Sequence, residues 1–380
     1  MRSVACPRAR ARRAGPQGAG LPAAVLLLVS LGVSACSTPE SLEQTAAAKG
    51  EAIHDSIDVR STDEADTVLL LARANAHLIA AGVHDDKDEL RAQLDRLLQL
   101  RIEGEGGWGW GLSYPWDAYG DGVVNPADTI YSYTTAAAAL ALLDGYAVLG
   151  DEKYLEAARQ AGAALTVDTC CWRDGDHVSV WYDDQPNDQR NERQVHNVNG
   201  LALAAFTRLD EATGDSRYAD LTSAMAEHLI EEQGEGYAQE NYGKTRVADS
   251  NWAYSQAEPG RPNDLIHEAF IVEGLLTYGT DEAVQAARRS LDGMLATHFN
   301  DGEPREGKYT FGSLGWGPGA ALFVLAMVDD YRDAARPVAE NLSEAVSDEG
   351  RSTLADAEQL RAQAWYSLGL ARFANEPGLR

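Results

Sequence analysis

Cysteine is scarce in this sequence, with four residues in 380. No CxxC motif and no Cys/His spacing typical of zinc is present, which leaves redox catalysis and a structural zinc site without support. Cys6 and Cys36 lie near the N-terminus, so only the adjacent pair Cys170 and Cys171 remains in the rest of the chain. That pair is compatible with a strained disulfide between neighbours or with two free thiols.

Basic residues are also few. Lys and Arg number 32 against 59 Asp and Glu, which gives a formal net charge of −27. A surface this acidic repels nucleic acid and anionic lipid headgroups, so nucleic-acid binding is not expected. The acidity is typical of a protein kept soluble in an extracytoplasmic or saline setting.

Long hydrophobic runs are absent except near the N-terminus. Five arginines between positions 2 and 13 precede an apolar stretch, Leu21–Val33, which is shorter than the roughly 20 residues of a spanning helix. Val33-Ser34-Ala35-Cys36 resembles the lipobox of bacterial lipoproteins, in which the cysteine is acylated after cleavage. The resemblance implies a lipoprotein signal peptide at 1–35 and Cys36 as the lipidation site, modified by palmitate or a similar chain. The protein would then sit in the bacterial cell envelope, outside the cytoplasm, and touch the membrane through its lipid only. An ordinary secretory signal is the alternative.

Strand-like alternation is rare, and helical periodicity dominates after Thr62. Leu149–Tyr154 and Thr213–Tyr218 share one pattern 64 residues apart: a helix ends at Gly, Asp starts the next helix, and Tyr falls in its first turn. Similar short turns recur near Gly279 and Asp329. A fixed period in this range is typical of a helical repeat.

The connectors between the expected helices alternate in length. Those that begin with the capping turns have two to four residues, whereas the others exceed ten and lie near 103–128, 167–195, 233–263 and 299–312. All long connectors should therefore lie at one end of an up-down array. Counting a weak helix near 40–57, the pattern predicts about twelve helices in six hairpins closed into a ring. We expect one domain at 63–380, after a partly helical tether at 36–62.

Three stretches resemble the inner helices of α/α-toroid proteins of the six-hairpin glycosidase kind: Tyr133–Leu143, His196–Leu201 and His267–Leu275. That group contains glycoside hydrolases, polysaccharide lyases and sugar epimerases. The resemblance covers roughly residues 63–375 and implies an all-α fold, an (α/α) toroid of about six helical hairpins, without fixing the reaction. A squalene-cyclase-like toroid is a weaker match, because the acidic run Asp85–Asp88 lies at a helix start, where acids are expected anyway.

One long connector, Gly106–Tyr119, carries five aromatic residues separated by Gly and Pro, which cannot form a regular helix face. Flat aromatic rings at the rim of a toroid suit stacking against sugar rings. Rings that plug the hole or pack beneath the loop are the alternative. We predict that carbohydrate contacts the following residues: Trp108, Trp110, Tyr114, Trp116, Asp117, Trp181, Trp252 and Trp316.

Glycoside hydrolysis needs two carboxyl groups about 5 to 9.5 Å apart. The rim offers carboxyl groups from three long connectors: Asp117, Asp121, Asp128, Asp183, Asp184, Asp264 and Glu268. Asp128 and Asp264 also suit an N-cap, whereas the pair Asp183-Asp184 follows two aromatic residues in a loop, and we select Asp183, Asp264 and Glu268. His196 and His267 open two inner helices, similar to the acid/base pair of N-acylglucosamine 2-epimerase-like proteins, but the spacing and flanks do not match closely, and a structural role fits each. In a lyase or uronate epimerase, a phenol protonates a carbanion, and Tyr131 and Tyr133 suit this role, although packing at a helix start suits both equally; we select Tyr133. The six predicted catalytic candidates are therefore Asp183, Asp264, Glu268, His196, His267 and Tyr133.

No cofactor is expected. The loop Asp174–Asp188 and the stretch Asp117–Gly122 are rich in oxygen ligands that suit Ca²⁺, but Tyr119 stands where a donor is needed, and a solvated acidic loop is the default interpretation. The sequence therefore predicts an enzyme that acts on a poly- or oligosaccharide by hydrolysis, elimination or epimerisation. A non-catalytic surface lipoprotein that binds a glycan or a protein is the alternative from another class.

Overall fold

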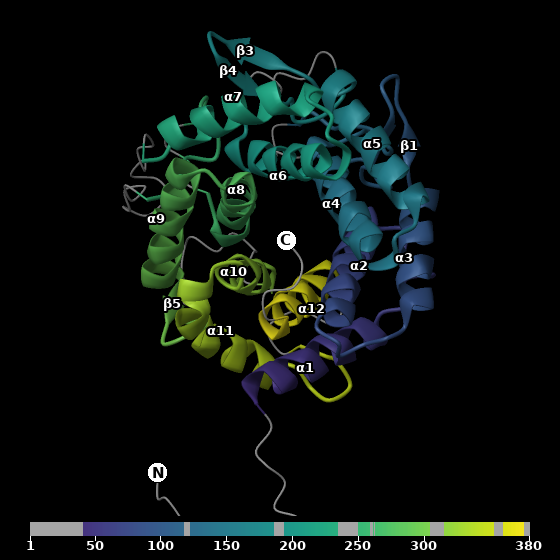
Figure 1. Cartoon of the computed structure of the whole chain (residues 1–380), viewed down its shortest axis with the longest axis vertical. Helices are drawn as coiled ribbons and strands as arrows, with labels where there is room; N and C mark the ends of the chain where they lie inside the picture. The colour runs from purple at the N-terminus through teal and green to yellow at the C-terminus, as the bar shows by residue number, and fades with distance from the viewer. Residues whose placement is uncertain are drawn as a thin grey trace, which may run out of the picture. The chain divides into compact units, whose positions relative to one another are not determined.

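The computed structural model describes residues 41–117, 122–185, 194–234, 250–258, 261, 263–304, 315–352 and 360–375. The predicted signal peptide at 1–35 and the lipidation site Cys36 lie outside these ranges. Residues Glu40–Arg380 form one compact unit, a ring of helices (Figure 1). Among the described residues, no helix is both long and apolar enough to cross a membrane.

Twelve α-helices in the described part of the chain alternate between an inner and an outer ring (Figure 1). The inner helices are α2 (Ala65–Ala80), α4 (Ser132–Leu149), α6 (His196–Thr213), α8 (Leu265–Tyr278), α10 (Gly317–Leu325) and α12 (Leu360–Ala374). The outer helices are α1 (Leu42–Ser56), α3 (Lys87–Gln99), α5 (Glu152–Val167), α7 (Arg217–Glu231), α9 (Asp281–His298) and α11 (Arg332–Ala345), and the 3₁₀ turn Asp329–Tyr331 precedes the last. Each inner helix packs against the next, and α12 packs against α2, which closes the toroid. The predicted fold class is confirmed.

The burial pattern explains which helices lie inside. Helices α4 and α8 are apolar around almost their whole circumference, as expected for helices covered on both sides. Outer helix α11 instead buries one stripe, Ala335, Val338, Ala339 and Leu342, and exposes the opposite face. On the inner ring, Gly200 of α6 and Gly274 of α8 touch backbone to backbone, so a Cβ on Gly274 would collide with Gly200.

The short turns form as the sequence predicts. Gly150, Gly214 and Gly279 end α4, α6 and α8 in the left-handed conformation, with φ of 66°, 65° and 75°. Asp151 then caps α5 by accepting a hydrogen bond from the backbone N–H of Lys153 at 3.1 Å. These turns lead each of the three inner helices directly into its outer partner, so their C-terminal ends share the short-turn end of the ring.

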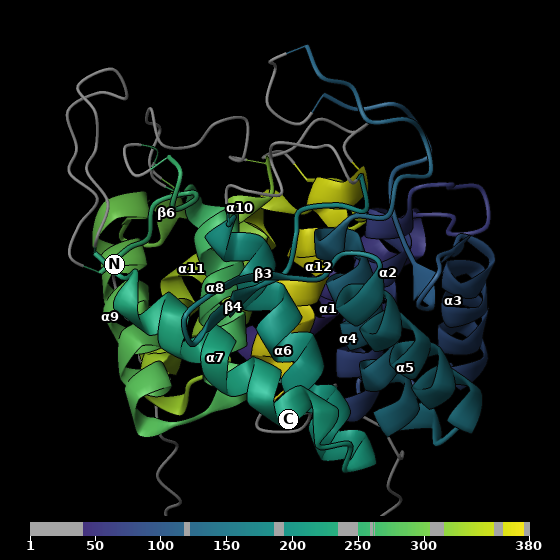
Figure 2. The same cartoon turned by 90° about the horizontal axis from the view of Figure 1, so that it is seen from above.

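The long connectors lead into the N-terminal ends of the inner helices, which run nearly parallel in Figure 2. Three connectors contain two-stranded antiparallel hairpins: β1 (Ile102–Glu103) with β2 (Trp108–Gly109), β3 (Trp172–Asp174) with β4 (His177–Ser179), and β5 (Phe299–Asn300) with β6 (Glu303–Pro304). The prediction that the long connectors share one end of the array is confirmed. We call this the long-connector end.

The N-terminal boundary of the ring lies earlier than the sequence suggests. Helix α1 packs against α12 and buries Ala46, Ala47 and Ile53 in the core. The weak helix predicted near 40–57 is present as α1, and the compact unit begins at Glu40 rather than at residue 63, so the stretch predicted as a partly helical tether belongs to the ring from Glu40 on. The Ala-rich sequence of α1 contains an apolar face that is covered mainly by α12, more than 300 residues later in the chain.

Candidate functional site

The first turns of five inner helices bring together polar and aromatic side chains at the long-connector end. This group, which we call the mouth, consists of Asp66, Tyr114, Tyr133, His267, Trp316 and Arg361, with Phe270 and Trp365 as its floor. Tyr133 stacks on Phe270 with ring centroids 5.3 Å apart. Phe270 in turn lies 5.7 Å from Trp365. The floor residues are buried, whereas the rings of Tyr114, Tyr133, Trp316 and His267 have accessible surface.

An ion pair with a buried carboxylate joins two inner helices at the mouth. Arg361 of α12 donates to Asp66 Oδ2 of α2 at 2.7 Å, and its guanidinium lies 3.6 Å from the ring centroid of Trp316. Asp66 is 3% exposed, and its second oxygen, Oδ1, has no hydrogen-bond partner in the described part of the chain. Burial raises the pKa of Asp66, and the Arg361 charge offsets this only in part. The mouth therefore contains a carboxyl group whose pKa lies above its ordinary value.

A cavity of about 170 Å³ lies beside this ion pair. Glu64, Asp66, Tyr114, Trp316 and Arg361 contribute to its walls, and Tyr114 is 45% exposed. Aromatic faces next to charged hydrogen-bonding groups are what a saccharide site requires. Sequence reasoning predicted Tyr114 and Trp316 but missed Asp66 and Arg361, because an acid in a first helical turn and a lone Arg carry no distinguishing pattern.

His267 and Asp264 form a dyad on α8. Asp264 caps the helix by accepting from the His267 N–H at 3.1 Å, and the same oxygen lies 2.7 Å from His267 Nδ1. Although burial alone would raise it, the pKa of Asp264 is held below its usual range by His267. The carboxylate fixes the proton on Nδ1 and leaves Nε2 as an acceptor on a ring that is 31% exposed. The capping role considered for Asp264 and its contact with His267 are thus both present.

The consecutive aspartates Asp183 and Asp184 lie beside the N-terminus of α4. Asp183 is fully buried and accepts from Asn125 Nδ2 at 2.7 Å and from the backbone N–H of Gln185 at 3.0 Å. Asp184 is half-buried, and its backbone N–H donates to the Ile130 carbonyl. Burial raises the pKa of the Asp184 carboxyl. The two carboxyl groups therefore have different environments, one enclosed among N–H donors and one nearer to solvent.

Aromatic rings surround this pair. Trp116 lies edge-on to Tyr131, with centroids 5.7 Å apart, and 6.5 Å from Tyr182. Asp117 accepts from the backbone N–H of Gly122 at 2.9 Å. Trp181 is half-buried, and its carbonyl accepts from Ser132 Oγ at the start of α4. Four predicted residues, Trp116, Asp117, Trp181 and Asp183, therefore lie together at the long-connector end.

Three of the predicted sugar-contacting tryptophans are elsewhere. Trp110 and Trp252 have no exposed surface, and their indole N–H groups donate to the backbone carbonyls of Leu97 and Leu229. A ring without exposed surface cannot stack on a sugar, so the prediction is wrong for both. Trp108 lies on the β1–β2 hairpin, which packs against outer helix α5, with the Arg101 guanidinium 4.6 Å from its ring centroid. It is outside the mouth.

Glu268 does not have the place predicted for a catalytic acid. It is fully buried and accepts from Ser290 Oγ of outer helix α9 at 2.6 Å, so it faces away from the centre of the ring. Burial raises the pKa of Glu268 to about 8, which keeps it protonated at neutral pH. Glu268 does lie in the first turn of an inner helix, as predicted, but its side chain points toward the outer ring of helices.

His196 also faces outward. It is buried, its Nδ1 contacts the Ala253 carbonyl at 2.9 Å, and its ring lies 5.8 Å from His228 of outer helix α7. Burial lowers the pKa of His196 to about 4. The structure therefore separates His196 from His267, and a catalytic histidine pair of the epimerase kind is not formed. Tyr133 does lie at the mouth, where burial raises the pKa of its phenol.

Below the mouth, buried ion pairs cross the interior of the ring. Arg73 of α2 donates to Asp144 of α4 at 3.0 Å and to Glu273 of α8 at 2.6 Å. Arg208 of α6 also contacts Asp144. Since α2 and α8 lie on opposite sides of the ring (Figure 1), these side chains brace its interior beneath the mouth.

The structure does not support a Ca²⁺ site in the described parts of the two acidic loops. Within the described ranges, the His and acid groups that could hold an ion lie near α1 and α3, not in the loops considered for Ca²⁺. Parts of those loops, including residues 118–121 and 186–193, lie outside the residues that the structure describes.

Cys170 and Cys171 are joined as a disulfide between neighbours, one of the two alternatives left open by the sequence.

Comparisons with known proteins agree on the fold. No protein-family model matches the sequence, and no curated protein matches it. Among solved structures, a glycoside hydrolase family 76 α-mannanase of Bacteroides thetaiotaomicron is similar, with 14% identity, coverage of 88% of this chain and 96% of that one, and a TM-score of 0.61. A family 76 α-1,6-mannanase of Salegentibacter sp. is similar at 12% identity, with coverage of 88% and 99% and a TM-score of 0.61. A cellobiose 2-epimerase of Bacillus thermoamylovorans is similar at 13% identity, with coverage of 81% and 87% and a TM-score of 0.52. A variant of the Salegentibacter enzyme with two consecutive aspartates replaced by asparagine is inactive, and its structure contains α-1,6-mannotriose.

Proposed function

We propose that this protein is a carbohydrate-active enzyme of the glycoside hydrolase type, with its active site at the long-connector end of the toroid. The observation that carries the proposal is the placement there of a consecutive aspartate pair, Asp183 and Asp184, in two contrasting environments and among aromatic rings. Pairs of carboxyl groups with contrasting environments are how glycosidases divide the roles of acid and base or nucleophile.

Position within the ring singles out this pair. The described chain contains three consecutive aspartate pairs: Asp85-Asp86, Asp183-Asp184 and Asp329-Asp330. The first precedes α3 and the last forms a 3₁₀ turn before α11, so both follow the C-terminal ends of inner helices. Among these three pairs, only Asp183 and Asp184 lie at the long-connector end, beside the rings of Trp116, Tyr131 and Tyr182. The loss of activity in the mannanase variant that lacks two consecutive aspartates supports the same choice.

The two carboxyl groups have different tasks in this proposal. Asp184, whose pKa is raised by burial, protonates the glycosidic oxygen of the leaving sugar. Asp183, held by Asn125 and the Gln185 N–H, is the second carboxylate, which acts on water or on the anomeric carbon. Because Asp183 has no exposed surface in this conformation, substrate binding must open a path to it.

The mouth supplies the binding surface. Tyr114 and Trp316 offer rings for sugar faces, and Arg361 and His267 Nε2 offer a donor and an acceptor for hydroxyl groups. The alternative of a sugar epimerase requires two opposed acid/base groups at one carbon. The separation of His196 from His267 favours hydrolysis over that reaction.

The N-terminal features complete the proposal. We infer that the chain is a bacterial lipoprotein, anchored through Cys36 on the outside of the cytoplasmic membrane, with the ring beginning a few residues later. The lipobox-like sequence before Cys36 supports this location. Metabolic labelling with radioactive palmitate tests it: the wild type should incorporate label and Cys36→Ala should not. Equal labelling of both proteins would contradict lipidation at this site.

Product analysis tests the reaction. The purified protein is incubated with α-1,6-linked manno-oligosaccharides, other neutral glycans and uronate-containing glycans, and each mixture is followed by proton NMR. Hydrolysis predicts new reducing-end signals. Unsaturated uronate signals would indicate a lyase, and altered ring couplings without cleavage an epimerase. Line broadening without any product over a long incubation would replace the enzyme with a binding protein.

A further inference from the structure

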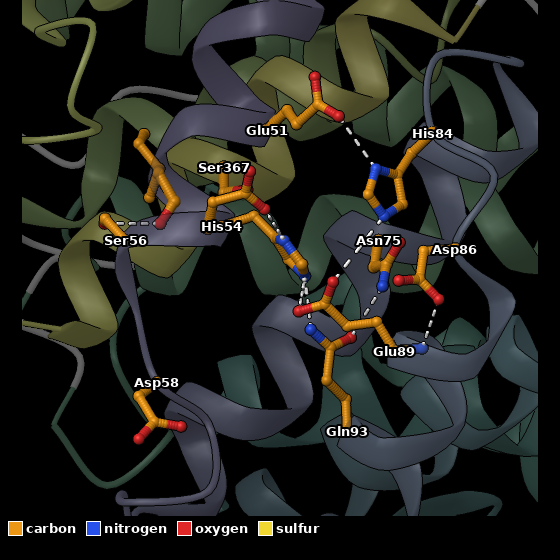
Figure 3. Close-up of polar contacts among 12 residues, drawn as sticks. Glu51, His54, Ser56, Asp58, Asn75, His84, Asp86, Glu89, Gln93 and Ser367 are labelled. Carbon is orange, nitrogen blue, oxygen red and sulfur yellow. Dashed lines mark hydrogen bonds and ion pairs between the residues drawn. The ribbon is translucent and has the colours of Figure 1, made fainter.

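A second group of polar side chains lies on the outer wall of the ring, away from the mouth. It joins α1, the turn that follows α2, and α3, and it includes Glu51, His54, His84, Asp86 and Glu89 (Figure 3). One nitrogen or oxygen atom from each of His84, Asp86 and Glu89 lies within 4.8 Å of the other two. We propose that these three residues bind a divalent first-row transition metal ion, such as Zn²⁺ or Mn²⁺.

The proton on His84 is already in the position that metal binding requires. His84 Nδ1 lies 3.0 Å from Glu51 Oε1, and a carboxylate can only accept, so Nδ1 carries the hydrogen. Nε2 then presents a lone pair toward Glu89 (Figure 3). That nitrogen is buried and has no hydrogen-bond partner among the described residues. Imidazole ligands of metals have this arrangement, with the second nitrogen donating to a carboxylate.

The two carboxylates face the same point. His84 Nε2 lies 3.9 Å from Glu89 Oε2, and two ligands of one ion at metal–ligand distances near 2.1 Å lie roughly 3 to 4 Å apart. Asp86 uses Oδ1 to cap α3, accepting from the N–H groups of Asp88 at 3.0 Å and Glu89 at 2.9 Å. Its other oxygen is therefore directed away from the helix end and can coordinate an ion.

His54 packs beside Glu89 and is not itself a ligand in this proposal. Its Nδ1 faces Asp55 at 3.2 Å, and its Nε2 accepts from the amide of Gln93, whose oxygen accepts from Asn75. Both ring nitrogens of His54 are thus in use. Nε2 nevertheless lies 3.7 Å from Glu89 Oε1, so His54 restricts the side of the Glu89 carboxylate that faces inward.

The surroundings favour a cation with open coordination positions. A cavity of about 530 Å³ adjoins the group, and five of its lining residues are acidic (Asp55, Asp58, Asp86, Asp88 and Glu89) against one basic residue, Arg60. This field attracts divalent cations, and water from the cavity can complete the coordination shell. One imidazole nitrogen with two carboxylates suits a borderline transition metal, whereas Ca²⁺ prefers oxygen ligands alone.

The ion would tie the turn after α2 to α3, and Glu51 would couple this hairpin to α1 at the start of the ring. His84, Asp86 and Glu89 lie on the α2–α3 hairpin, and Glu51 links His84 to α1, which packs on α12 at the closure of the toroid. Ion binding should therefore raise the melting temperature. The site is distinct from the residues proposed for hydrolysis, so either proposal can fail alone.

Calorimetric titration of chelator-treated protein with ZnCl₂, MnCl₂ and CaCl₂ tests this proposal. The wild type should bind one Zn²⁺ or Mn²⁺ per chain, with a rise in melting temperature, and His84→Ala should lower the affinity at least 100-fold. Glu51→Gln, which keeps all three ligands, should lower it about 10- to 100-fold by loosening the orientation of His84.

His177 and Glu231 provide a matched control, because they form a His–Glu contact at 2.9 Å on the β3–β4 side of the ring. His177→Ala and Glu231→Gln should bind metal as the wild type does. If His84→Ala does not fold, Glu89→Gln replaces it in the test, because this variant keeps the size of the side chain but should also bind the metal ion more weakly. Absence of Zn²⁺ and Mn²⁺ binding in the wild type, or wild-type affinity in both His84→Ala and Glu89→Gln, would overturn the proposal. Binding of Ca²⁺ alone, with equal affinity in His84→Ala, would also overturn it.

Discussion

Replacing Glu268 by Gln should change how stability depends on pH. In the folded protein, burial raises the pKa of Glu268 from 4.5 to about 8. Below pH 4.5 the side chain is protonated in both the folded and the unfolded chain. Between pH 4.5 and 8 the unfolded chain loses this proton while the folded chain keeps it, so the free energy of unfolding falls as the pH rises. The total loss is about 5 kcal/mol and is complete above pH 8.

The amide of Gln has nearly the same shape and does not titrate, so Glu268→Gln removes this dependence. The difference in unfolding free energy between the variant and the wild type should grow in favour of the variant by about 5 kcal/mol between pH 4 and pH 9. Urea unfolding followed by circular dichroism at a series of pH values measures it. Glu340→Gln, on the exposed face of α11, is the control and should run parallel to the wild type. Parallel curves for Glu268→Gln would refute the burial argument and return Glu268 to the list of candidate acids.

Three further changes test the ring and its mouth. Arg73→Met leaves Asp144 and Glu273 buried without this partner, so unfolding free energy should fall by about 3 to 5 kcal/mol in urea titrations; an unchanged midpoint would contradict the bracing role. Gly274→Ala forces α6 and α8 apart and should cost about 1 to 3 kcal/mol, and a stabilised variant would show that the contact is not tight. Trp316→Ala should weaken saccharide binding roughly 3- to 10-fold in calorimetry, whereas the matched Trp108→Ala on the outer hairpin should not; equal effects would exclude the mouth as the binding surface.

The sequence predicts the toroid well because its signals are local. Gly150 and Gly214 end helices through backbone conformation alone, and connector length decides which end of the ring each loop occupies. These features do not depend on distant partners. The start of the ring was placed too late because α1 depends on α12, a contact that no local pattern reveals.

The site is predicted only in part, because first-turn residues of inner helices can face either way. His267 and Glu268 are neighbours in the sequence, yet one reaches the mouth and the other packs against Ser290 of α9. Trp110 and Trp116 lie in one Gly-rich connector, yet Trp110 is fully buried and Trp116 is not. Asp66 and Arg361 were not predicted because they become recognisable as site residues only through their ion pair, which joins positions almost 300 residues apart. Composition identifies the aromatic connectors but cannot give the orientation of each ring.

The most direct test of the central claim compares turnover by Asp184→Asn and Asp330→Asn. Both substitutions remove one carboxylate from a consecutive pair, but Asp184 lies at the long-connector end, whereas Asp330 contacts Arg288 at the short-turn end. With a glycan cleaved by the wild type, kcat should fall by at least 100-fold in Asp184→Asn, with binding retained, and stay near the wild-type value in Asp330→Asn. Undiminished turnover by a folded Asp184→Asn protein would contradict the assignment of the active site to this pair.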